Sequence, residues 1–316
     1  MKQIILTGSL SVDRIMNFGG KYEEMIQKDK LHVLSLSVLI DSLTDSPGGT
    51  AGNIAYNLGL LGASPRLFGV IGNNDQGYLT RLRALGVNTD EVHLSPLATA
   101  TYTVMTDSAD NQVGGFFPGA MTDYETVTLS RVSPDNVFVV VSANDRGAMQ
   151  KYVMEAKQLR IPFVYDPGQQ VNNIEGGDIR EGVTSCQILM INDYEMGVIV
   201  EKTGMSLEEI ESTVPVVVVT LGSQGSKISG HDVESEIVIP ALPGIKVVDP
   251  TGAGDAYRGG FLYGFAHGWP VSDCARLGSI TASFAVAVKG TQEHVFTLAG
   301  LKDLYYDNYR ITYPNI

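Results

Sequence analysis

Four short apolar runs in the second half of the chain constrain its fold more than any other feature. They span residues 137–141, 163–165, 188–191 and 216–220, and helical patterns at 148–159 and 207–211 lie between them. Strands that are apolar throughout indicate a sheet buried on both faces, because an exposed face would carry polar residues at alternate positions. The pattern therefore predicts a mostly parallel sheet covered by helices on both sides.

Polar residues follow three of these four runs. Asp166 follows the second run, Asn192 and Glu195 follow the third, and Thr220 and Gly222 close the fourth. Each group alone is typical of an ordinary turn. Because ligands of open α/β sheets bind beyond the carboxyl ends of the strands, the three groups together indicate a site.

A glycine-rich segment, DPTGAGDAYRGGF at 249–261, follows a valine pair at 247–248 that we interpret as a short strand. Gly252 and Gly254 leave the backbone bare, and a helical pattern begins at Asp255. The free N–H groups and the dipole of a helix N-terminus make an anion site. Asp255 is then either a helix cap or a general base that meets a phosphoryl group and a hydroxyl.

The first half of the chain has a second glycine loop. Residues 3–6 predict a buried strand, and Asp13 beyond its end is either a turn residue or a ligand contact. In 45–63, DSPGGTAGNIAYNLGLLGA, Gly48 and Gly49 open a turn that leads into a helix. These glycines allow close approach to a ligand, although a tight connection onto a helix explains them equally well.

The 316 residues contain no linker and no repeat, so we expect one large α/β domain with a small β appendage, or lid. We assign residues 1–14, 40–98 and 118–316 to the large domain, and residues 15–39 and 99–117 to the lid. Phe116 and Phe117, between glycines and Pro118, either form a hairpin core or cover a flat ligand ring.

The amino-acid composition limits the classes of molecule that the protein is expected to bind. The net charge of -13, from 22 basic and 35 acidic residues, argues against nucleic acid and anionic membranes. An anionic substrate would then need backbone dipoles and a divalent cation. Cys186 and Cys274 are the only cysteines, which fits a reducing compartment. The N-terminal apolar run is too short for a signal peptide, and 284–288 is too short to cross a bilayer, so we expect a cytoplasmic protein.

Several common motifs are missing from the sequence. There is no P-loop, no G-x-S-x-G, and no G-x-G-x-x-G, since Tyr257 interrupts the glycine pattern that begins at Gly252. The histidines show no metal-ligand spacing; they are His32, His93, His231, His267 and His294.

The glycine segments carry a family resemblance. Residues 249–261 resemble the C-terminal signature of the ribokinase-like (PfkB) carbohydrate and nucleoside kinases, and GGTAGNIAYNLGLLG at 48–62 resembles their N-terminal signature. Shorter segments follow in the family's order: Gly8 with Asp13, GNNDQG at 72–77, NDYE at 192–195 and TLGSQG at 220–225. The resemblance covers essentially the whole chain. It implies a three-layer α/β/α ribokinase-like fold with a mostly parallel central sheet and a small β lid, and phosphoryl transfer from ATP to a hydroxyl.

The resemblance also implies roles for individual residues. Asp255 matches the catalytic base, and the anion hole matches the backbone of Gly252, Ala253, Gly254 and Asp255. Positions that hold the substrate match Asp13, Gly48, Gly49 and Asn53. Positions that bind ATP match Asn192, Glu195, Thr220, Gly222 and Gly225, with Glu195 reaching Mg²⁺ through water. Some family members bind a monovalent cation such as K⁺ near the position of Asp249. Arg258, one helical turn further, either adds a charge for ATP or forms a surface salt bridge.

The lid sequence bears on the acceptor. Residues 16–37, with NQVGGFFPGAM at 111–121, resemble bacterial nucleoside kinases of the adenosine-kinase type more than ribokinases or fructokinases. A purine needs a flat apolar slot, which Phe116 or Phe117 with Met16 or Met121 would form. We therefore expect phosphorylation of the 5′-hydroxyl of a purine ribonucleoside (adenosine, inosine or guanosine), with Asp13 and Asn17 holding the ribose.

Two alternatives remain: a sugar kinase of the same fold, and a catalytically silent nucleotide-binding protein, against which Asp255 and the anion-hole glycines argue. A homodimer through the lid is a further expectation, because a small exposed sheet has edges to cover.

Overall fold

The computed structural model of this protein describes residues 1–26, 33 and 35–314. Part of the lid segment that we assigned to 15–39, namely 27–32 and 34, lies outside the described residues, and so does His32.

Within the described residues, the central sheet has nine strands. Their spatial order is β13 (Ile237–Ile239), β12 (Ser226–Ser229), β11 (Val216–Thr220), β10 (Ile188–Asn192), β9 (Phe163–Asp166), β8 (Val137–Ser142), β1 (Gln3–Thr7), β4 (Arg66–Gly72) and β5 (Val92–Ser95). The strands from β11 to β5 are parallel, and β12 and β13 are antiparallel additions at one edge. The predicted mostly parallel sheet is confirmed.

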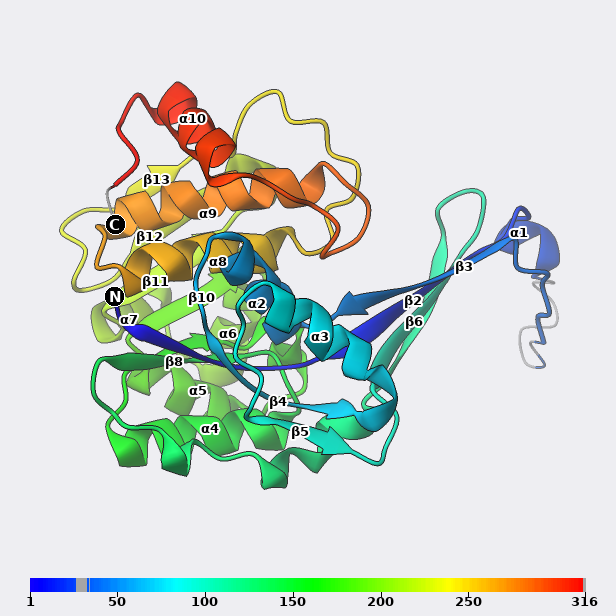
Figure 1. Ribbon diagram of the computed structural model, residues 1–316, viewed down its shortest axis with the longest axis horizontal. Coiled ribbons are helices and arrows are strands. Elements are labelled where there is room, and N and C mark those ends of the chain that lie inside the picture. Colours follow the sequence, from blue (N-terminus) through cyan, green and yellow to red (C-terminus); the bar gives the residue numbers. More distant parts are fainter. Residues whose placement is uncertain (27–32, 34, 315–316) are drawn as a thin grey trace.

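Helices cover both faces of this sheet (Figure 1). One layer contains α2 (Thr50–Leu60), α3 (Gln76–Ala84), α8 (Ala253–Ala266), α9 (Val271–Val286) and α10 (Leu298–Tyr309). The other contains α4 (Arg146–Leu159), α5 (Gly176–Ser185), α6 (Asp193–Thr203) and α7 (Leu207–Thr213). In β8, Phe138 and Val140 pack toward the first layer and Val139 toward the second, as the period of a strand requires. The three-layer α/β/α fold is confirmed.

Short 3-10 helices connect several of these elements: η2 (Asn73–Asp75), η3 (Gly119–Thr126), η4 (Leu129–Arg131), η5 (Gly168–Asn172) and η6 (Gly222–Gln224).

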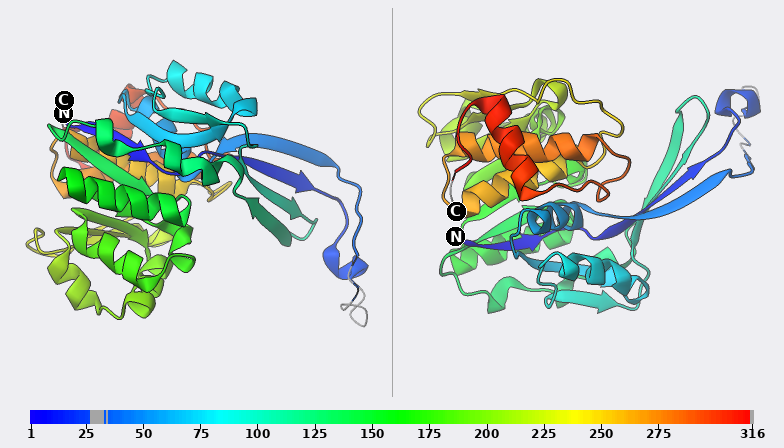
Figure 2. Two further views of the ribbon diagram at one scale, coloured as in Figure 1. Left: turned by 90° about the horizontal axis from the view of Figure 1, so that it is seen from below. Right: turned by 45° about the horizontal axis from the view of Figure 1, so that its top comes forward.

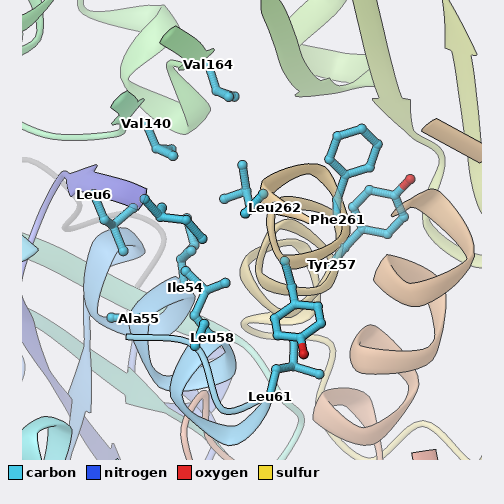
Figure 3. Close-up of a cluster of buried hydrophobic side chains, with 14 of the residues drawn as sticks. Leu6, Ile54, Ala55, Leu58, Leu61, Val140, Val164, Tyr257, Phe261 and Leu262 are labelled. Carbon is cyan, nitrogen blue, oxygen red and sulfur yellow. The ribbon is translucent and has the colours of Figure 1, made fainter. Parts of the chain in front are cut away.

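The core between α2, α8 and the sheet fixes the position of the glycine segments. Figure 3 shows Leu6, Val140 and Val164 of the strands facing these two helices. The helices contribute Ile54, Ala55, Leu58, Tyr257, Phe261 and Leu262 to the same cluster. Burial of one such side chain contributes roughly 1.5–3 kcal/mol, so the N-termini of α2 and α8 are held firmly together.

The lid is a second sheet, and within the described residues it has four strands. Their order is β3 (Ser42–Gly48), β2 (Ser11–Asn17), β6 (Ala100–Thr106) and β7 (Gln112–Phe117). The sheet projects from the body on the side away from both termini, and α1 (Tyr22–Met25) lies near its far end (Figure 1 and Figure 2).

Two predictions about the chain's organisation were wrong. Ser42–Gly48 pairs along β2 in the lid, although we assigned residues 40–98 to the large domain, and β2 itself begins at Ser11, within 1–14. This edge strand was missed because its mostly exposed side chains show no apolar alternation, and an edge tolerates Pro47. The valine pair at 247–248 lies in an exposed irregular segment rather than in a strand.

Candidate active site

The N-terminus of α8 is an open cradle of backbone donors. Gly252 is the N-cap residue and has a φ of 79°, a left-handed conformation that glycine adopts without strain. No side chain caps this end. Among the described residues, the N–H groups of Gly252, Gly254 and Asp255 have no acceptor. These groups and the helix dipole therefore face whatever anion binds there.

Asp255 does not cap the helix, so the capping interpretation was wrong. Its Oδ2 instead accepts a hydrogen bond of 2.7 Å from Nδ2 of Asn53, a residue of α2. Burial raises the pKa of Asp255, and the Arg258 guanidinium and the Asn53 amide oppose that rise. The arrangement yields a carboxylate that is poorly solvated, held in one direction and basic for its type.

Arg258 is buried rather than on the surface, and its guanidinium binds Asp166 at 2.6 Å and lies 4.0 Å from Glu195. Burial disfavours its charge, but the carboxylates of Asp166, Glu195 and Asp255 outweigh that effect and raise the pKa of Arg258. The predicted surface salt bridge was therefore wrong. The predicted contact with ATP stays a prediction: Nη2 of Arg258 donates to Asp166, whereas Nη1 lies beside the cradle, 2.7 Å from where a Cβ atom at Gly254 would be.

The strand ends assemble as the sequence indicated. Asp166, Asn192 and Thr220 end the neighbouring strands β9, β10 and β11. Asn192 and Glu195 form a capping box on α6, in which the Asn192 side chain accepts from the Glu195 N–H and the Glu195 carboxylate accepts from the Asn192 N–H. This reciprocal cap explains the Asn-x-x-Glu spacing structurally and points the Glu195 carboxylate toward Arg258.

A cavity of about 440 Å³ adjoins the anion cradle. Its lining includes three predicted ATP-binding residues, Thr220, Gly222 and Gly225, and the cradle residues Ala253 and Gly254. Apolar residues that the sequence interpretation missed complete it: Leu242, Ile245, Val247, Ala282 and Val286. The volume is that of a site for a drug-sized or nucleotide-sized ligand. Val247, which we interpreted as part of a strand, lines this cavity instead.

Asp13 lies near the start of the lid strand β2, close enough to Asp255 for the two charges to interact. Burial and the nearby charges of Asp255 and Asp249 raise the pKa of Asp13 to about 6. A Cβ atom at Gly48 would come within 2.4 Å of the Asp13 carboxylate. Gly49, with a φ of 88°, would place a Cβ atom 2.6 Å from the Ser9 carbonyl oxygen. Both glycines are therefore required by the close packing of this loop.

The register of the lid separates its aromatic residues. Residues directly opposite on neighbouring strands share a face, and Asp13 pairs with Tyr102, which pairs with Phe116. Phe117 pairs with Thr101 and so lies on the opposite face. Tyr102, Phe116 and Phe117 are all at least 40% exposed, so the hairpin-core alternative was wrong. The face that carries Asp13 has an aromatic surface, of which sequence reasoning missed Tyr102.

Three other predicted lid contacts lie elsewhere. Asn17 shares the face of Asp13, but it is four residues further along β2, roughly 13 Å away, and donates to Ser42. Met16 lies on the face opposite Asp13, since neighbouring residues of a strand alternate. Met121 is buried at the base.

Asp249 accepts hydrogen bonds from the N–H groups of Gly290, at 3.0 Å, and Thr251, at 2.9 Å. Burial alone would raise its pKa, but these bonds hold the pKa of Asp249 below its usual range. The carboxylate is thus ionised beside the anion cradle. In the described part of the chain, no three His, Cys, Asp or Glu side chains gather as a metal site.

Asp13 and the uncapped N-terminus of α8 therefore both lie near Asp255. The described residues contain no helix with the length and apolar character of a membrane span.

Known proteins are similar to this chain over most of its length. The pfkB family of carbohydrate kinases matches residues 11–297. The structure of Burkholderia thailandensis nucleoside kinase in complex with inosine is 32% identical, with a TM-score of 0.87 over 98% of this chain and 99% of that one. Its complex with ADP-inosine is 34% identical, with a TM-score of 0.84 over 98% and 97%. A nucleoside kinase of Methanocaldococcus jannaschii is 28% identical over 94% of each chain.

Proposed function

This chain belongs to the pfkB family of carbohydrate kinases and is a phosphotransferase that acts on a hydroxyl group, and from that premise we propose that it phosphorylates the 5′-hydroxyl of a purine ribonucleoside with ATP. The observation that carries the proposal is the position of Asp255, in the first turn of α8 at the anion cradle and near Asp13, which shares a face of the lid with two aromatic side chains.

Different residues of the chain carry out different parts of the proposed reaction. Asp13 accepts hydrogen bonds from the ribose hydroxyls and so fixes the acceptor. Asp255 takes the proton of the attacking hydroxyl, and the free N–H groups of Gly252, Gly254 and Asp255 stabilise the charge on the transferred phosphoryl group, whereas the Ala253 N–H donates to the Pro250 carbonyl. The lid would exclude water, which otherwise competes as the acceptor.

The proposal includes a divalent cation near the carboxylates at the strand ends, although these do not form a ready-made metal site among the described residues. The charges of Asp166, Glu195 and Asp255 act on Arg258, and the guanidinium contacts the first two of these carboxylates. One Asp166 oxygen is also buried without a partner among the described residues. Carboxylate oxygens and water are the ligands that Mg²⁺ prefers. We propose that Glu195 holds Mg²⁺ through water; the ion, when bound, offsets the charge of the ATP phosphates.

Three further parts of the proposal concern a monovalent cation, assembly and location. The ionised Asp249 next to the cradle supports a monovalent cation such as K⁺ at that carboxylate.

Every residue of the edge strand β7 is exposed, including Val113 and Phe117, which supports a homodimer through the lid. The two cysteines are free and buried, and together with the composition this supports a cytoplasmic protein.

The substrate class is tested with a panel of acceptors. Values of kcat/KM for adenosine, inosine, guanosine, ribose and fructose should be highest for a purine nucleoside. Phe116→Ala should raise KM for the nucleoside about 10-fold by removing an aromatic contact with the base, whereas Phe117→Ala, on the opposite face, should change it little. Higher kcat/KM for the sugars, or equal effects of the two variants, would exclude the proposed purine slot.

The pH dependence should report Asp13. Its pKa is raised to about 6, so the ionised form that grips ribose is lost as the pH falls through that value, and kcat/KM should decline on the acid side. Asp13→Asn should bind nucleoside poorly at neutral pH yet be more stable than the wild type, because a raised carboxyl pKa means that ionisation destabilises the fold. Thermal unfolding and KM measured on the same preparation check both; a destabilised variant would contradict the argument.

A further inference from the structure

A continuous line of buried hydrogen bonds connects the Gly48 loop with Asp255. The Tyr78 hydroxyl donates to the Gly48 carbonyl at 2.7 Å. Nε2 of Gln292 donates to the Tyr78 hydroxyl at 2.8 Å and to Oδ1 of Asn53 at 2.9 Å. Nδ2 of Asn53 then donates to Asp255 at 2.7 Å.

The chemistry of the two ends determines the direction of every bond in this line. A carbonyl and an ionised carboxylate accept hydrogen bonds and cannot donate them. Because both ends are acceptors, one group between them must donate in both directions. Tyr78 has a single O–H, which it donates to Gly48, so it cannot donate a second time. The Asn53 amide accepts at its oxygen and donates at its nitrogen, so it donates in one direction only. The NH₂ of Gln292 is therefore the group that donates in both directions.

Burial makes this orientation matter energetically. Gln292 is 1% exposed and Asn53 4%, so water does not replace a lost partner without cost. Without a donor at its oxygen, the Asn53 amide would be free to turn and present Oδ1 to the Asp255 carboxylate. The Gln292 amide is oriented with its nitrogen toward Tyr78 and Asn53, although its Oε1 has no partner among the described residues.

The segment that carries Gln292 is anchored on both sides. The Gly290 N–H donates to Asp249, and the Thr291 hydroxyl donates to the Pro47 carbonyl at 3.1 Å. On the far side, Nε2 of His294 lies 2.8 Å from Oδ1 of Asn57 in α2. These contacts place the Gln292 amide at a fixed position over the start of α2.

We propose that Gln292 is a positioning residue: as a double donor it orients the Asn53 amide, and through Asn53 it aims Asp255 at the acceptor hydroxyl. This inference rests on the proposed role of Asp255 as base. The Gln292 amide is buried and, among the described residues, donates only to Asn53 and Tyr78, so it acts on the chemical step and leaves ATP binding unchanged.

Two variants test the inference. Gln292→Glu keeps the shape of the side chain but, when ionised, has no donor; it should lower kcat by about 10-fold or more and move the acid limb of the kcat profile to higher pH. Gln292→Met removes the donors without adding charge and should lower kcat with KM for ATP unchanged. Thermal unfolding with ADP bound verifies that each variant is folded.

A double-mutant cycle separates positioning from a general packing role. In an Asn53→Ala background, Gln292→Met should cause no further loss of kcat, because the residue through which Gln292 acts is gone. Multiplying losses would overturn the inference, and so would a normal kcat in both single variants. Asp255→Asn is measured in parallel: turnover in that variant would reject the proposed base, whereas an inactive Asp255→Asn with unaffected Gln292 variants would reject only the role of Gln292.

Discussion

Asp255→Asn should lower kcat by about 100-fold or more while ATP binding persists, because an amide cannot take the proton of the acceptor hydroxyl. The backbone cradle at 252–255 does not depend on this side chain, since no side chain caps α8. The variant also retains a polar group that Asn53 can contact. Steady-state turnover, with ATP affinity from calorimetry, gives the two quantities needed.

The control for this experiment is Asp193→Asn, which changes an exposed acid in the first turn of α6. It should leave turnover unchanged. Near-normal turnover in Asp255→Asn would remove Asp255 from its role as base, and a loss of ATP affinity equal to the loss of turnover would assign it to nucleotide binding instead.

Arg258→Met should destabilise the protein by about 3–5 kcal/mol, because it leaves buried carboxylates without their cation. Asp166 is 2.6 Å from the guanidinium and essentially inaccessible to water. Burial already raises the pKa of Asp166 against the opposing effect of Arg258, so loss of the guanidinium would raise it further. Urea unfolding at neutral pH measures the change in the free energy of unfolding.

The chain offers a matched control for this ion pair. Arg14 binds Asp45 at the same 2.6 Å, but both side chains are 44% exposed on the lid. Arg14→Met should cost at most about 1 kcal/mol, since solvent screens an exposed pair. Equal losses in the two variants would show that burial of Arg258 does not determine its contribution.

The fold was largely predictable because its strands carry their own signal. Continuous apolar runs such as 216–220 require burial on both faces, and the helices between them follow. The lid was harder to delimit. β3 is an edge strand with exposed polar side chains, so its pairing with β2 depends on tertiary contacts that no local pattern encodes.

The candidate site was likewise predictable only in part. Glycine-rich segments before helices are visible in a sequence, and Gly252 and Asp255 lie where the pattern indicated. Whether a charged side chain is buried is not visible in a sequence, which is why a surface salt bridge was one interpretation of Arg258. Gln292 lies in a loop with no periodicity, and only the folded chain brings it to Asn53, 239 positions away.

Phosphorus NMR of the product formed from inosine and ATP tests the central claim most directly. Our account predicts ADP and a nucleoside monophosphate whose phosphorus couples to the protons at C5′, formed by the wild type and almost absent with Asp255→Asn. Phosphate on another ribose oxygen, or inorganic phosphate alone, would contradict it.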